Sequence, residues 1–137
     1  MDISSLSMQF MEFFDKLSSW EHSVVKDSGL SPAQMHTIEV IGHHKTMMMR
    51  ELADRLGITT GSLTVAIDRL EKLGMVERKP HEHDRRAWLI VLTVDGTKMY
   101  KQHNKFHEEF TREISQDLST KEIESLTFLM KTVLRRM

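Results

Sequence analysis

The stretch MRELADRLGITTGSLTVAIDRLEKLGMVERK, residues 49–79, constrains the fold more than any other part of the chain. Apolar residues recur every three or four positions on both sides of Gly57, which predicts two short amphipathic helices joined by a tight turn. Thr59 is suited to cap the second helix, and Gly74 is suited to end it in a left-handed conformation. We expect the buried stripe of this second helix to consist of Leu63, Ala66, Ile67, Leu70 and Leu73. The pattern predicts a helix-turn-helix.

A β-hairpin is predicted directly after these helices. Met75 to Lys79 and Ala87 to Thr93 are both typical of short strands, and in the second strand Trp88, Ile90 and Leu92 alternate with Leu89 and Val91. The segment between them, PHEHDRR, is charged and rich in arginine and histidine. We therefore expect a wing whose strands anchor it to the core while its tip stays in solvent, where an arginine can enter a narrow minor groove.

Helices are also predicted on both sides of this region. Residues 4–27 carry apolar side chains at helical spacing, and their aromatic content suggests packing on a partner subunit as well as on the core. Gly29 ends this helix. Ser31 and Pro32 then begin the next one, which should bury Met35, Ile38 and Ile41 and end near Gly42.

Composition and charge narrow the function. The chain of 137 residues is sufficient for one domain, and without cysteine any metal site must use His, Asp or Glu. The net charge is −1, but residues 45–101 hold eleven Lys and Arg against eight Asp and Glu, which places the positive charge around the helix-turn-helix. No membrane span or secretory signal is visible, so a cytoplasmic location is expected. Glycines 57, 61 and 74 are typical of turns and caps rather than of a phosphate-binding loop, and no catalytic set is recognisable, so we expect no enzyme activity.

The sequence resembles the MarR family of bacterial winged-helix repressors. The resemblance rests on ELADRLGITTGSLTVAIDRLEKLGMVERK, on DRR at 84–86 and on LTVDG at 92–96, and it extends over essentially the whole chain. It implies a mainly α fold with a small β-hairpin wing (α+β), formed by one domain over residues 1–137. Dimerisation helices are expected at about 4–28 and 95–136, and a DNA-binding lobe at about 45–93. The implied function is that of a homodimeric, ligand-responsive repressor on a palindromic operator in double-stranded DNA.

The same resemblance implies the DNA contacts, residue by residue. The positions expected to contact the major groove are Thr59, Thr60, Gly61, Ser62 and Thr64. Arg85 is the candidate for the minor groove, with Asp84 expected to orient Arg85 or Arg86. Phosphate contacts are expected from Arg69, Arg78 and Lys79. Many family members carry arginine after the recognition-helix threonine, whereas this chain has Val65, which predicts a shifted base preference.

Three effector classes are compatible with the sequence, and none of them requires a permanently bound cofactor. The first class is a metal ion, with zinc as the candidate. His103 and His107 lie four residues apart on a predicted helix, which is suitable spacing for zinc. They match two ligand positions of the zinc-responsive branch of the family; His36 matches a third, and Glu21 or His22 can supply the fourth. Eight histidines will also often place two at this spacing by chance.

The second class is an acyl chain or acyl-carrier protein, because QMHTIEVIG, VERK, DRR and HNKFH are similar to the fatty-acid-synthesis repressor branch. Methionines and aromatic residues could line a flexible apolar cavity for such a ligand, although they are also typical of a core. The third class is a small aromatic or amphipathic compound. A different function is a winged helix that contacts protein or RNA instead of DNA. A markedly acidic recognition face would support it, whereas this face is hydroxylated and flanked by Arg69 and Arg85.

Overall fold

The computed structural model describes residues 2–137, which divide between residues 102 and 103 into two compact units. The first unit holds α1 (Ile3–Val25), a 3₁₀ turn (Lys26–Ser28), α2 (Pro32–His44), β1 (Thr46–Met48), α3 (Met49–Leu56), α4 (Thr60–Lys72), β2 (Val76–Pro80) and β3 (Trp88–Leu92). Helix α5 (Val94–Ile114) begins in the first unit and continues unbroken into the second, which also holds α6 (Thr120–Leu134). No helix within residues 2–137 is long and apolar enough to cross a membrane.

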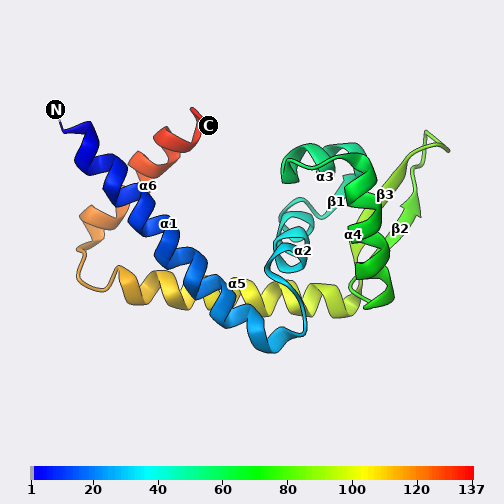
Figure 1. Cartoon of the computed structure of the whole chain (residues 1–137), viewed down its shortest axis with the longest axis horizontal. Helices are drawn as coiled ribbons and strands as arrows, with labels where there is room; N and C mark the ends of the chain where they lie inside the picture. Colours follow the sequence, from blue (N-terminus) through cyan, green and yellow to red (C-terminus); the bar gives the residue numbers. More distant parts are fainter. Residues whose placement is uncertain (1) are drawn as a thin grey trace. The chain divides into compact units, whose positions relative to one another are not determined.

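The predicted helix-turn-helix is confirmed. Gly57 follows α3 with a φ of 68°, a left-handed conformation that glycine adopts without strain. The Thr59 side chain then accepts a hydrogen bond from the backbone N–H of Ser62 and caps α4. Figure 1 shows the two short helices, in green, packed beside the hairpin.

The inner face of α4 forms part of the core of the first unit. Leu63, Ile67 and Leu70 are fully buried and belong to one apolar cluster with residues of α2, α3 and the strands. Leu73, which we expected in the same stripe, is 47% exposed. This expectation was wrong because Leu73 is the C-cap, where the helix ends, and Gly74, with a φ of 74°, changes the direction of the chain directly after it.

The wing is confirmed as an antiparallel hairpin, but the sheet has a third strand. β2 and β3 pair from Val76–Leu92 to Pro80–Trp88, and β1 pairs along the other edge of β3, giving the order β1-β3-β2. The side chain of Ile90 is fully buried in the central strand, whereas Trp88 near the wing tip is 47% exposed. β1 was not predicted, because three residues are too few to show an alternating pattern.

The LTVDG motif joins the wing to α5. The hydroxyl of Thr93 donates to the carbonyl of Gly74 and accepts from the backbone N–H of Gly96, so one side chain ties the end of α4 to the start of α5. Gly96 is required by close packing, since a Cβ there would lie 1.9 Å from the carbonyl oxygen of Met75. The motif thus fixes the exit of the hairpin.

The flanking helices agree with the sequence in type and differ in their limits. Ser31 caps α2 in a capping box with Gln34, as expected, but the helix continues past Gly42 to His44. The glycine lies against Tyr100 of α5, where a Cβ would come within 2.5 Å of the ring. The region expected as one dimerisation segment at 95–136 contains two helices, because Ser119 starts α6 with a capping box of its own.

Candidate nucleic-acid interface and metal centre

The outer face of α4 presents the residues predicted to contact the major groove. Because Leu63, Ile67 and Leu70 are turned into the core, the first turns of the helix leave the other side in solvent. The residues exposed there are Thr59, Thr60, Gly61, Ser62 and Thr64. Their side chains are short, so nothing on this face prevents the helix backbone from coming close to a base edge.

Several of these hydroxyls already make hydrogen bonds within the chain. Thr59 Oγ1 donates to Ser62 Oγ over 3.1 Å, and Thr64 Oγ1 donates to the carbonyl of Thr60 over 2.9 Å. Each hydroxyl has only one proton to donate. The bonded hydroxyls of Thr59 and Thr64 therefore offer the solvent acceptor lone pairs and methyl groups rather than a donor.

The wing tip carries the exposed arginines Arg85 and Arg86. Asp84 Oδ1 accepts a hydrogen bond of 2.9 Å from the backbone N–H of Arg86, and the carbonyl of Asp84 accepts one of 3.1 Å from Ala87. His81 Nδ1 accepts from the N–H groups of His83 and Asp84. The tip is thus a folded turn. We expected Asp84 to orient an arginine, and its carboxylate holds the backbone of Arg86.

Arg78, predicted to contact phosphate, lies between two carboxylates of α4. Its guanidinium donates to Asp68 Oδ1 over 2.7 Å and also to Glu71 Oε1, and the side chain is 23% exposed. The bond to Asp68, more than any other interaction, raises the pKa of Arg78 above its ordinary value. This arrangement links β2 to α4 and neutralises two acidic groups of that helix.

The other two candidates for phosphate contact are less constrained. Arg69 is exposed near the end of α4. Lys79 Nζ lies 3.6 Å from Glu77 Oε1 with both side chains more than half exposed, a geometry that contributes little to stability. Both side chains are free to reorient toward a phosphate.

A second group of candidate residues begins with the two histidines of α5. The Nε2 atoms of His103 and His107 lie 3.1 Å apart in a hydrogen bond, so one imidazole donates and the other accepts. Two ligand atoms on a tetrahedral metal at zinc–nitrogen distances of 2.0–2.1 Å would be about 3.3 Å apart. The pair therefore has the spacing that a shared cation requires, and His103 is 2% exposed.

Glu21 on α1 and Glu39 on α2 form a carboxylate pair. Burial, followed by the charge of Glu21 and a hydrogen bond to it, raises the pKa of Glu39 to about 7. A proton held between two carboxylates at neutral pH marks a position where positive charge is favoured. A divalent cation can replace such a proton.

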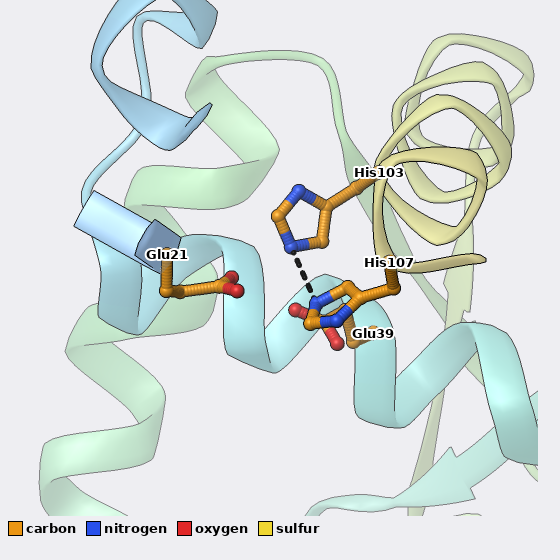
Figure 2. Close-up of side chains that lie close together, drawn as sticks. All are labelled: Glu21, Glu39, His103 and His107. Carbon is orange, nitrogen blue, oxygen red and sulfur yellow. Dashed lines mark hydrogen bonds between the residues drawn. The ribbon is translucent and has the colours of Figure 1, made fainter. Parts of the chain in front are cut away.

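Figure 2 shows these two pairs together. One ligand atom from each of Glu21, Glu39, His103 and His107 lies within 4.8 Å of the others. We call these four residues the Glu₂His₂ group. Two imidazoles and two carboxylates suit zinc and other divalent transition metals.

The Glu₂His₂ group differs in one member from the ligands expected by resemblance. Of the two alternatives for the fourth ligand, Glu21 is in the group, whereas His22 bonds the carbonyl of Ser18. His36 is exposed and lies outside the group, and Glu39 is the additional member. Glu39 lies three residues after His36 and so shares its side of α2, which is the signal by which sequence reasoning could have found it.

The chain is similar to known regulators over most of its length. Residues 28–87 match the model of the MarR family. The uncharacterized HTH-type transcriptional regulator YcgE of Bacillus subtilis is 28% identical over 125 residues, covering 88% of this chain and 81% of that protein. The multiple antibiotic resistance protein MarR of Salmonella typhimurium is 34% identical over 85 residues, 61% of this chain and 59% of that protein. The crystal structure of Streptococcus pneumoniae FabT in complex with DNA superposes with a TM-score of 0.86 at 25% identity, covering 98% of this chain and 96% of that one.

Replacing Arg78 tests its link between α4 and the wing. We expect Arg78→Gln to lower the free energy of unfolding by about 1 kcal/mol, because Asp68 and Glu71 lose a partly buried partner. Adding Asp68→Asn and Glu71→Gln should recover part of the loss by removing the two unpaired charges. Lys79→Gln, which removes the same charge from an exposed pair, should change stability by less than about 0.5 kcal/mol. Urea denaturation measures all four proteins, and equal losses for Arg78→Gln and Lys79→Gln would contradict the link.

The raised pKa of Glu39 makes the stability of the chelator-treated protein depend on pH. The folded state keeps the proton up to about pH 7, whereas an unfolded glutamate loses it near 4.5. The contribution of Glu39 to the free energy of unfolding is therefore fully present below about pH 4.5 and is lost as pH rises through 7. At pH 8 we expect Glu39→Gln to be more stable than the parent by about 1–2 kcal/mol, after allowance for solvent screening. Thermal denaturation from pH 5 to 8 measures this, and parallel profiles for the two proteins would refute it.

Proposed function

We propose that the chain is a regulator of the MarR family, to which it is similar in sequence and in fold, and that it acts as a homodimeric repressor on a palindromic operator in double-stranded DNA. One observation carries this proposal. The exposed face of α4 is lined with hydroxyl side chains and a glycine, and α4 packs against β2 of the wing, whose tip bears Arg85 and Arg86. The relatives and the structure reported above are regulators or DNA complexes by name, which supports a regulator rather than an enzyme at the level of the family.

The two contact surfaces suit different parts of the duplex. The first turns of α4 are narrow and lined with short side chains, so they can enter the major groove and approach base edges. The wing tip is an exposed turn with two adjacent cations, which suits a minor groove, where the negative potential is strongest. Arg69 and Lys79 supply further positive charge for phosphates.

Exposed apolar surface on α1 and on α6 supports a dimer. Each helix has large hydrophobic side chains in solvent, more than isolated surface residues would explain. The exposed residues on α1 are Ile3, Leu6, Met8, Phe10, Met11, Phe13 and Phe14, and those on α6 are Ile123, Leu126, Phe128, Leu129, Met130, Val133 and Leu134. We propose that a second copy of the chain covers both surfaces, which would hold two α4 helices at the fixed spacing that a palindrome requires.

The DNA contacts are tested with an operator selected from a random duplex library. We expect Arg85→Ala and Thr64→Ala each to weaken binding, by roughly 1–3 kcal/mol for a residue in contact with a base. Arg112→Ala removes the same charge from α5 and should change affinity much less. Fluorescence anisotropy measures affinity, and sedimentation measures the oligomeric state. Unchanged affinity in both α4 and wing variants, or a monomer at the concentrations of the assay, contradicts the proposal.

We further propose that a divalent transition metal, with zinc as the test case, is an effector of this regulator. The Glu₂His₂ group supports this, since its two imidazoles have metal-ligand spacing and the pKa of Glu39, raised to about 7 by burial and by Glu21, marks a position where a cation is favoured. The four residues come from α1, α2 and α5, so a bound ion would couple elements that precede and follow the DNA-binding segments in the sequence. The ion can shift the protein only by its difference in affinity between two conformations.

The metal proposal has a matched control within α2. We expect Glu39→Gln and His107→Ala to lower zinc affinity at least tenfold, because each removes one ligand of the group. His36→Ala removes an exposed histidine one turn from Glu39 and should leave zinc affinity unchanged. Competition with a chromogenic chelator measures affinity, and the selected operator shows whether zinc changes DNA binding.

Other results of these measurements point to other ligands. Loss of zinc binding in His36→Ala but not in Glu39→Gln would restore the ligand set expected from the family resemblance. Equal zinc affinity in all variants refutes a site at the Glu₂His₂ group. If zinc leaves operator affinity unchanged, acyl-carrier protein and small aromatic acids are added to the same assay to test the acyl and small-molecule alternatives.

A further inference from the structure

Val65 is an apolar residue on the face of α4 that we assign to the DNA. Its side chain is 51% exposed and takes no part in the core cluster. On a helix, Val65 lies on the same side as Gly61, one turn earlier, and Arg69, one turn later. The space around Gly61 is open, since an added Cβ would meet only the Thr59 hydroxyl at 3.9 Å. Val65 therefore stands beside a shallow part of the helix surface that a base pair could approach.

Two of the four hydroxyls on this face have already donated their protons within the chain, which leaves those of Thr60 and Ser62 as donors. Thr64 donates its hydroxyl proton to the carbonyl of Thr60, and Thr59 donates its own to Ser62. Guanine presents two acceptors in the major groove and adenine presents one, so both are bound best by side chains with donors. Thymine differs from the other bases by its C5-methyl group, which an apolar side chain can contact without any hydrogen bond.

We propose that Val65 packs against the methyl group of a thymine in each operator half-site and thereby sets part of the base preference. This rests on the proposed function, since it needs α4 in the major groove of a selected sequence. The Thr64 methyl group lies next in the chain and can widen the apolar contact. The alternative is an ordinary exposed valine with no partner, which surfaces often carry.

Uracil substitution isolates the thymine methyl group, because uracil keeps every hydrogen-bonding atom of thymine. The full-length protein is bound to the selected operator and to duplexes in which single thymines are replaced by uracil. At one position in each half-site we expect a loss of about fourfold, the value of one buried methyl group. Replacing both symmetry-related thymines should lower the affinity for the duplex about fifteenfold, if the two half-sites contribute independently.

Variants then assign the methyl contact to one side chain. Val65→Ala should bind the thymine and uracil duplexes equally, whereas Val65→Thr, which keeps the branched shape, should still prefer thymine. Val94→Ala shortens a valine that is 74% exposed at the start of α5, and it should keep the full fourfold difference. Since both valines are exposed, thermal denaturation should show all variants folded.

Each result decides the matter. The assignment of Val65 is overturned if uracil at every thymine position leaves the affinity unchanged, or if Val65→Ala still binds the thymine duplex more tightly than the uracil duplex. Both outcomes leave operator binding intact. If selection enriches no sequence, sequence-specific DNA binding itself is refuted, and the assignment of Val65 fails with it. Thymine preference in the parent and in Val94→Ala, lost in Val65→Ala, supports it.

Discussion

Burial of one face of α4 determines what its other face presents to solvent. Leu63, Ile67 and Leu70 are fully buried, and on a helix of 3.6 residues per turn their burial turns the positions between them outward. The edge that carries Gly61 and Thr64 is therefore a consequence of core packing. Any change that rotates the buried stripe would also replace the residues on the exposed face, so core packing and the surface that this helix presents are coupled.

Elements with strong local signals could be predicted from the sequence. The α3–α4 hairpin followed from apolar spacing and from Gly57, whose left-handed conformation the structure confirms. Ser31 gave the start of α2 because a cap and a following proline act locally. Expectations failed where the deciding partner is distant in sequence. α2 continues past Gly42 where that residue packs on Tyr100, and β1 exists because β3 offers it an edge.

The candidate sites show the same division. The exposed residues of α4 were predictable because a helix with one apolar face has a defined opposite face. The role of Arg78 was not, since its two carboxylate partners lie seven and ten residues away on another element. Glu39 was missed for a related reason: its spacing from His36 was the one local signal, and its partner Glu21 lies on another helix. Charge pairs between elements carry little signal in the spacing of a single sequence.

The distribution of donors suggests how affinity and specificity are divided. Arg78 is committed to Asp68 and Glu71, so the cations available for DNA are the exposed ones, above all Arg85 and Arg86 on the wing. Contacts to phosphate add affinity without sequence information and weaken steeply with salt. On α4, by contrast, the hydroxyls of Thr59 and Thr64 are bonded within the chain and Val65 is apolar, so the hydroxyl donors left on this face are those of Thr60 and Ser62. Under the proposed function, we therefore expect affinity to come mainly from the wing, and base choice to depend on apolar contacts and the remaining hydroxyl donors in the major groove and on the width of the minor groove.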